Sequence, residues 1–194
     1  MAGATGVIGS RLVPLLVRDG HTVAGMTRSE AKARVLVEQG ATPVVVDVFE
    51  RDRLIEAVRS IEPEVIIHEL TDLPDEASRI GEFAARNARI RREGTANLLA
   101  AAERSDTARF LAQSIAWQLD GDDGEAVAFL EEAVLDFGGT VLRYGQLYGS
   151  GTFHEAKPPP PPRIHVDEAA RRTLTALEAG PGILEITETI GSNA

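Results

Sequence analysis

Three glycines near the start of the chain are spaced for binding a dinucleotide. Gly3, Gly6 and Gly9 stand three residues apart in the stretch GATGVIG. In such a loop one glycine permits a tight turn, one lets the backbone approach a pyrophosphate, and one lets the following helix pack close to the sheet. A helix predicted to begin near Ile8 would direct its N-terminal amides and positive dipole end at the phosphates. From this motif we expect cofactor contacts from Gly3, Thr5, Gly6, Val7, Ile8 and Gly9.

The end of the next predicted strand indicates which dinucleotide is bound. NAD-binding forms place Asp or Glu here to bind the ribose 2′-hydroxyl, whereas this chain has Thr27, Arg28 and Ser29. The guanidinium of Arg28 and the hydroxyl of Ser29 could bind a 2′-phosphate. The sequence therefore favours NADP over NAD, and the alternative is that Arg28 is a solvated residue at a strand end.

The elements that must position these residues alternate between strand and helix. This alternation predicts an α/β protein of the Rossmann type, a doubly wound parallel sheet with helices on both faces. A long helix is predicted from about Glu76 to Arg104, and a short final strand in GILEITE. The other strands are predicted at Thr22–Gly25, Pro43–Val46, Val65–His68, Arg109–Ala112 and Thr140–Leu142.

Composition limits the classes of partner. The 194 residues suffice for a single domain covering 1–194, and the net charge of −10 disfavours nucleic acid and anionic membranes. The chain has no cysteine, its four histidines are scattered, and we predict no metal site. Without a long apolar run or a signal-peptide pattern, we expect a cytoplasmic protein with a small-molecule substrate.

An ordered set of motifs resembles the short-chain dehydrogenase/reductase superfamily, in its extended or atypical NAD(P)-dependent epimerase/dehydratase branch. The motifs together cover most of the chain. They are GATGVIGSRLVPLLVRDGHTVAGMTRS, VVVDVFERDRL, EVIIHELTDLP, REGTANLLAAA, RFLAQSIAW, VLRYGQLYGSGT and IHVDEAARRTLTAL.

The resemblance implies roles for residues that follow the strands. Asp47, followed by Val48, matches the position whose carboxylate meets the adenine amino group. The positions of His68, Leu70 and Thr71 match the loop that passes the cofactor ribose, where the family's histidine usually serves structure. These four non-histidine residues complete the expected cofactor site.

The family's catalytic residues are not matched. Relatives use a Ser or Thr together with Tyr-x-x-x-Lys at the start of the helix after QSIAW, whereas this helix reads DGDDGEAVAFLEEAVLD and contains neither Tyr nor Lys. Ser114 lies one residue from the expected hydroxyl position. Tyr144 lies in the sixth-strand motif, whose following loop is near the nicotinamide in relatives. These two remain the candidate catalytic residues, with strand-end or packing roles as the alternatives.

The substrate side is reduced and the first strand is missing or truncated. A connector at 152–164, with five prolines expected to form polyproline II, replaces a long substrate-domain insertion. Only Met1 and Ala2 precede the glycine loop, too few for a strand. We therefore expect a hole or frayed seam between the strands at Thr22–Gly25 and Val65–His68, in a chain that either starts upstream or is a trimmed paralogue.

Two functions remain open. The chain is an NAD(P)-binding protein with oxidoreductase or sugar-nucleotide epimerase ancestry, or a non-catalytic dinucleotide-binding module or truncated non-functional paralogue. The family's helix contacts also suggest a homodimer. A basic run on the long helix either recognises an anionic substrate or forms a solvated face offset by nearby acids; it comprises Arg86, Arg89, Arg91 and Arg92.

Overall fold

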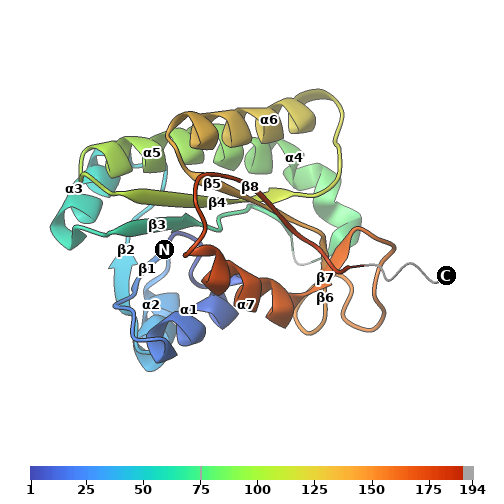
Figure 1. Cartoon of the computed structure of the whole chain (residues 1–194), viewed down its shortest axis with the longest axis horizontal. Helices are drawn as coiled ribbons and strands as arrows, with labels where there is room; N and C mark the ends of the chain where they lie inside the picture. The colour runs from blue at the N-terminus through green and yellow to red at the C-terminus, as the bar shows by residue number, and fades with distance from the viewer. Residues whose placement is uncertain (75, 190–194) are drawn as a thin grey trace.

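The strands of the computed structural model, which describes residues 1–74 and 76–189, pair in parallel (Figure 1). A four-stranded sheet has the order β3–β4–β5–β8, and a two-stranded sheet pairs β1 with β2. A small third sheet pairs β6 with β7. Their bounds are β1 Ala24–Thr27, β2 Thr42–Val45, β3 Val65–His68, β4 Arg109–Ile115, β5 Thr140–Tyr144, β6 Gln146–Tyr148, β7 Arg163–His165 and β8 Gly182–Ile186.

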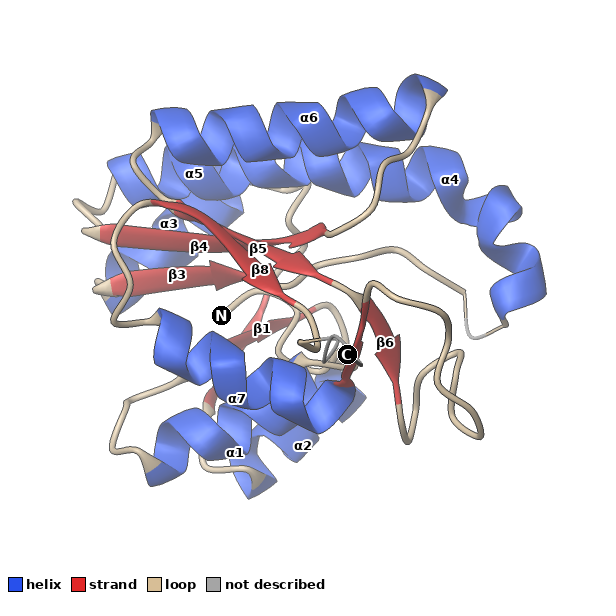
Figure 2. Ribbon diagram, turned by 45° about the vertical axis from the view of Figure 1, so that its right-hand side comes forward, coloured by secondary structure: helices blue, strands red, loops and turns tan. Residues whose placement is uncertain are grey.

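Helices cover both faces of the strands, as Figures 1 and 2 show. On one face lie α1 (Gly9–Arg18), α2 (Glu30–Glu38) and α7 (Val166–Ala176). On the other lie α3 (Arg51–Ile61), α4 (Ile80–Arg89), α5 (Thr95–Glu103) and α6 (Gly121–Asp136). Each face buries its own apolar core, the first around Leu12 and Leu142 and the second around Phe110 and Leu98.

The strands predicted from the sequence are all present, with shifts at their ends. Parallel pairing confirms the Rossmann-type fold, although β1 begins two residues later than expected. The predicted long helix comprises a 3₁₀ turn (Ala77–Arg79), α4, a π-helical turn (Ile90–Gly94) and α5. The stretch GTVLRYGQLYG divides into β5 and β6 at Gly145, where a Cβ would lie 2.7 Å from the Arg163 backbone.

Met1 and Ala2 lie between β1 and β3, where the sequence predicted a hole or frayed seam. Ala2 pairs with His68 through its N–H to Ile67 O and its carbonyl to the Glu69 N–H, each at 2.9 Å. On the other side, Met1 O accepts from Met26 N–H at 2.9 Å, and the Met1 amino group donates to Ala24 O at 2.7 Å. Two residues therefore bridge the two sheets, and an apolar cavity of about 40 Å³ lies beside them.

The proline-rich connector does not form a continuous polyproline II helix. Residues 160–162 bend, and Pro159 is buried while its carbonyl accepts a hydrogen bond from Arg163. Arg163 also pairs with Glu188 at 3.0 Å, so the connector is held against β7 and the segment after β8. Within the described residues, no helix has the length and apolar character required to cross a membrane.

Candidate dinucleotide site

A cleft of about 300 Å³ lies at the carboxyl ends of β1, β2 and β3, beside the glycine loop. Ligands of open α/β sheets bind at this edge. Ten of the thirteen expected cofactor residues line the cleft: Gly3, Thr5, Gly6, Thr27, Arg28, Ser29, Asp47, Val48, Leu70 and Thr71. Five residues that the sequence analysis did not select also line it: Met26, Lys32, Val46, Glu69 and Ile90.

The glycine loop is closely packed where the motif requires glycine. Gly3 has φ +81°, and a Cβ there would lie 2.4 Å from the carbonyl oxygen of Glu69. A Cβ on Gly9 would lie 2.1 Å from the carbonyl oxygen of Gly3. The loop is thus held against the end of β3, and α1 begins at Gly9 with its positive dipole end beside the cleft.

Gly9→Ala is expected to lower the free energy of unfolding by about 2 kcal/mol or more, because its methyl group meets backbone that cannot move aside without displacing the loop. The same substitution should also weaken dinucleotide binding, measured by fluorescence titration. The matched control is Gly81→Ala in α4, where a Cβ meets no atom within 4 Å. This control should gain about 0.5–1 kcal/mol, and equal stability of the two variants in urea unfolding would contradict the packing argument.

Three expected cofactor residues do not line the cleft. The side chain of Ile8 is buried in the core between α1 and the sheet, and Gly9 is buried against the loop backbone. Val7 is exposed, and its carbonyl accepts hydrogen bonds from Ser10 and Arg11. These residues form the start of α1 and do not line the cleft.

The cleft has a basic end formed by β1 and α2. Ser29 caps α2, with its Oγ accepting from Lys32 N–H at 3.4 Å, and its own N–H donates to Thr27 Oγ1. Arg28 is 60% exposed and lies 3.8 Å from Asp47 Oδ2. Asp47 is fixed from the other side by the N–H of Phe49 at 3.0 Å. Arg28, Lys32 and Ser29 therefore place two cationic residues and a hydroxyl-bearing residue at this end of the cleft.

Polar side chains from deeper elements hold the strand ends. Asn97 of α5 donates to Val48 O, and Gln113 of β4 donates to Leu70 O, each at 2.9 Å. His68 is fully buried, and its Nδ1 accepts from the Leu70 N–H, which leaves Nε2–H for Thr95 at 3.1 Å. Burial lowers the pKa of His68 to about 4, so a neutral imidazole orders the loop after β3, the structural role expected of it.

The two candidate catalytic residues lie outside the cleft lining. Ser114 is buried, and its hydroxyl donates to Glu131 Oε1 at 2.5 Å in a network with Arg143. Tyr144 is also buried, with its hydroxyl 2.9 Å from Glu69 Oε1 and 2.5 Å from Thr173 Oγ1. Neither lines the cleft, because the side chains at these strand positions point into the protein interior.

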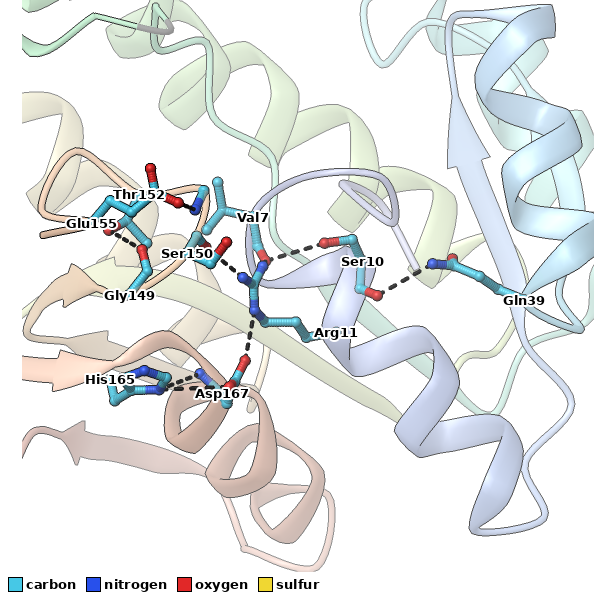
Figure 3. A network of polar contacts seen from close by, with 11 residues as sticks. Val7, Ser10, Arg11, Gln39, Gly149, Ser150, Thr152, Glu155, His165 and Asp167 are labelled. Atoms are coloured by element: carbon cyan, nitrogen blue, oxygen red, sulfur yellow. Dashed lines mark hydrogen bonds and ion pairs between the residues drawn. The ribbon is translucent and has the colours of Figure 1, made fainter.

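Arg11 connects the glycine loop to the far end of the chain, as Figure 3 shows. Its Nε donates to Asp167 at the start of α7 at 2.8 Å, and its Nη2 donates to Ser150 O at 2.5 Å. Its Nη1 donates to Val7 O at 2.8 Å. One guanidinium therefore joins the start of α1, the loop after β6 and the start of α7.

The basic run on α4 and the following π-helical turn is largely paired with acids. Arg86 contacts Asp72 at 3.0 Å, Arg89 contacts Glu93 at 2.6 Å, and Arg92 contacts Asp122 at 2.8 Å. These pairs favour the solvated-face interpretation. The described part of the chain holds no group of three or more metal-ligating side chains.

Comparisons with known proteins agree with this geometry. The chain is 34% identical over 231 residues to a Streptomyces protein named 3-diazoavenalumate denitrifying reductase, covering 97% of this chain and 75% of the relative. The fold is similar to that of the Thermus thermophilus UDP-glucose 4-epimerase solved with NAD, with TM-score 0.77, 18% identity and coverage of 96% and 76% of the two chains. The Bordetella bronchiseptica enzyme WbmH, solved with NAD⁺, has TM-score 0.75, 16% identity and coverage of 97% and 74%.

The family model gives the assignment directly. The model described as the NAD dependent epimerase/dehydratase family matches residues 1–116, which contain the glycine loop and the three strands whose ends form the cleft. The chain therefore belongs to the NAD dependent epimerase/dehydratase family.

Proposed function

We propose that the cleft binds NADP(H) and that the protein is a reductase. The observation that carries this proposal is the gathering of the glycine loop and a basic end around one cleft. The adenosine would lie by Asp47 and Val48, and the diphosphate by Gly3 and Gly6 at the start of α1. NAD, the alternative, would use the same cleft without engaging its basic end.

The preference for NADP rests on Arg28, Ser29 and Lys32. A 2′-phosphate carries up to two negative charges and accepts several hydrogen bonds. Arg28 offers a forked donor and Lys32 a second cation, and both line the cleft with Ser29. The contact between Arg28 and Asp47 is long, at 3.8 Å, so little is lost when the guanidinium turns toward a phosphate.

Arg28→Ala is expected to weaken NADPH binding by about 1–3 kcal/mol, roughly 5- to 150-fold, through loss of a charged hydrogen bond. NADH binding should change far less. Arg34→Ala, which removes the same charge from an exposed position of α2 outside the cleft, is the control. Fluorescence titration measures both cofactors, and an equal loss for NADPH and NADH would refute the preference.

The proposed chemistry follows from the missing proton donor. The chain's tyrosines are Tyr144 and Tyr148, and each hydroxyl contacts a glutamate. Its lysines are Lys32 and Lys157, so no Tyr-x-x-x-Lys pair exists in the sequence. Carbonyl reduction needs an acid positioned at the substrate, and the absence of this Tyr-x-x-x-Lys pair disfavours a carbonyl substrate.

A diazo substrate removes that requirement. A bound reduced nicotinamide supplies a hydride. When a hydride adds to a carbon bearing a diazonium group, a C–H bond forms, the C–N bond breaks, and N₂ leaves with the bonding electron pair. No proton is consumed, so Tyr and Lys are not needed. The 34% identical relative, named as a denitrifying reductase of a diazo compound, supports this substrate class.

The test combines the protein, NADPH deuterated at the transferable position, and benzenediazonium. Reductase activity predicts protein-dependent NADPH oxidation and benzene carrying one deuterium. NADPH binding without turnover would instead favour the non-catalytic module.

The homodimer stays a prediction, which sedimentation velocity would test.

A further inference from the structure

Glu69 is a cleft-lining residue whose carboxyl is buried beside the cleft. It follows β3 directly, is only 6% exposed, and lines the same cleft as Gly3 and Gly6. Its Oε1 lies 2.9 Å from the Tyr144 hydroxyl. Its Oε2 is buried and has no hydrogen-bond partner within the described residues. A carboxylate stabilised as an anion would receive several donors, and this carboxyl does not.

The contacts beyond Tyr144 bear on whether the Glu69 carboxyl carries a proton. Three close oxygen pairs follow one another: Glu69 Oε1 with Tyr144 Oη, Tyr144 Oη with Thr173 Oγ1 at 2.5 Å, and Thr173 Oγ1 donating to Ala169 O at 2.8 Å. The two hydroxyls carry one hydrogen each, and the Ala169 carbonyl carries none. If Tyr144 donates to Glu69 Oε1, the single hydrogen of Thr173 has to serve both Tyr144 and Ala169. All three pairs are hydrogen bonds at once only when Tyr144 donates to Thr173 and the carboxyl of Glu69 supplies the third hydrogen.

The surroundings favour this protonated form. The packed elements present Tyr144 from β5 and Thr173 from α7, and no cation bonds the carboxyl within the described residues. His68 lies on the opposite face of β3 and bonds Thr95, the Met1 amino group bonds Ala24 O, and Arg11 of α1 is engaged by Asp167. Burial raises the pKa of Glu69 to about 8.

We propose that Glu69 controls the charge that the cleft accepts: the protonated acid permits a dinucleotide to bind, and the ionised form opposes it. The inference rests on the proposed function, that the cleft binds NADPH. Glu69 lines the cleft together with the loop expected to hold the diphosphate, and an unpaired, buried carboxylate beside the cleft repels that anion.

The experiment measures the dissociation constant of NADPH from pH 7 to 9.5, a range in which the 2′-phosphate, with a second pKa near 6, is about 90% or more ionised. Wild-type affinity should fall at least tenfold across the range. Glu69→Gln, whose amide can still donate to Tyr144, should bind with nearly constant affinity. Every other pH-dependent property of the cleft is shared by the two proteins, so the difference between them reports Glu69.

Thr173→Val tests the proton count itself. Without the Thr173 acceptor, the Tyr144 hydroxyl is free to donate to Glu69, which stabilises the carboxylate. The pH midpoint of NADPH binding should therefore move to lower pH, a shift that a purely structural effect on packing would not produce. Difference infrared spectra of the unliganded proteins, wild type minus Glu69→Gln, should show a protonated carboxyl at pH 7.

Each outcome is decisive. An infrared spectrum with an ionised Glu69 at pH 7, or a wild-type affinity that stays flat to pH 9.5, overturns the inference. The inference is also overturned if the NADPH affinity of Glu69→Gln depends on pH as strongly as that of the wild type. Failure of NADPH to bind any of the proteins at any pH overturns the proposed function, and the gating role falls with it, even if the spectrum confirms the buried proton.

Discussion

Five or six β-branched residues added before Met1 are expected to raise the free energy of unfolding by several kcal/mol and to strengthen dinucleotide binding. They would continue the path of Met1 and Ala2 between β1 and β3, where Met1 pairs with β1 and Ala2 pairs with β3. Each Val or Ile fully buried there contributes roughly 1.5–3 kcal/mol. The glycine loop would then follow a full strand, which fixes the amides that face the phosphates.

The pH dependence of this gain identifies its origin. Burial lowers the pKa of the Met1 amino group from 8.0 to about 6. Between these values the unfolded chain binds more protons than the folded one, so stability rises from pH 6 to pH 8. The two-unit shift is worth about 3 kcal/mol. Because an extension converts this amine into an amide, its benefit should be larger at pH 6 than at pH 8.

A Gly-Ser extension of equal length is the matched control, since it removes the buried amine without adding apolar strand residues. This control should gain only the stability that comes from removing the buried amine, which is the part of the gain that differs between pH 6 and pH 8. Melting temperatures and NADPH titrations measure both effects. If the protein with the β-branched extension has the same melting temperature as the control and binds NADPH no more tightly, the seam between β1 and β3 does not limit stability.

Glu69→Gln is expected to stabilise the protein by roughly 4–5 kcal/mol at pH 9. The pKa of Glu69 is raised from 4.5 to about 8 in the folded state. Between those values the folded protein holds a proton that the unfolded chain has lost, so wild-type stability falls as pH rises from about 4.5 to 8. An amide does not titrate, and it keeps a donor for Tyr144.

The stability difference between Glu69→Gln and wild type should vanish near pH 4, where the carboxyl is protonated in both states. Urea unfolding at pH 4, 6 and 9 measures how this difference in the free energy of unfolding increases with pH. Glu103→Gln changes an exposed glutamate at the end of α5 and should stay within about 0.5 kcal/mol of wild type at each pH. A constant difference across the three pH values would show that packing, and not ionisation, governs the site.

Local patterns in the sequence were enough to place the strand ends that form the cleft. The glycine spacing, the Thr27-Arg28-Ser29 strand end and the position of Asp47 each depend on a few consecutive residues. Parallel strands bring their carboxyl ends to one edge, so ten of the thirteen expected residues meet there. Lys32 was detectable by the same reasoning, because the residue three positions after the α2 cap returns to the face of the cap.

The side-chain partners of buried polar residues depended on contacts between distant segments. Ser114 and Tyr144 have the residue types expected of catalytic groups, and only the packing of α6 and α7 shows that Glu131 and Thr173 occupy their hydroxyls. Glu69 reads as an ordinary loop acid in the sequence. Its contact with Tyr144 spans 75 positions, which no local pattern encodes.

Local sequence patterns predicted the α/β class, the parallel strands and the glycine loop, because hydrophobic periodicity and glycine geometry act over a few residues. The packed structure was needed to show which polar groups are buried, which hydroxyls are already bonded and where Met1 and Ala2 bridge the sheets. Those outcomes depend on burial and on donors and acceptors supplied by segments far apart in the chain, and such pairings are set only when the helices pack on the sheet.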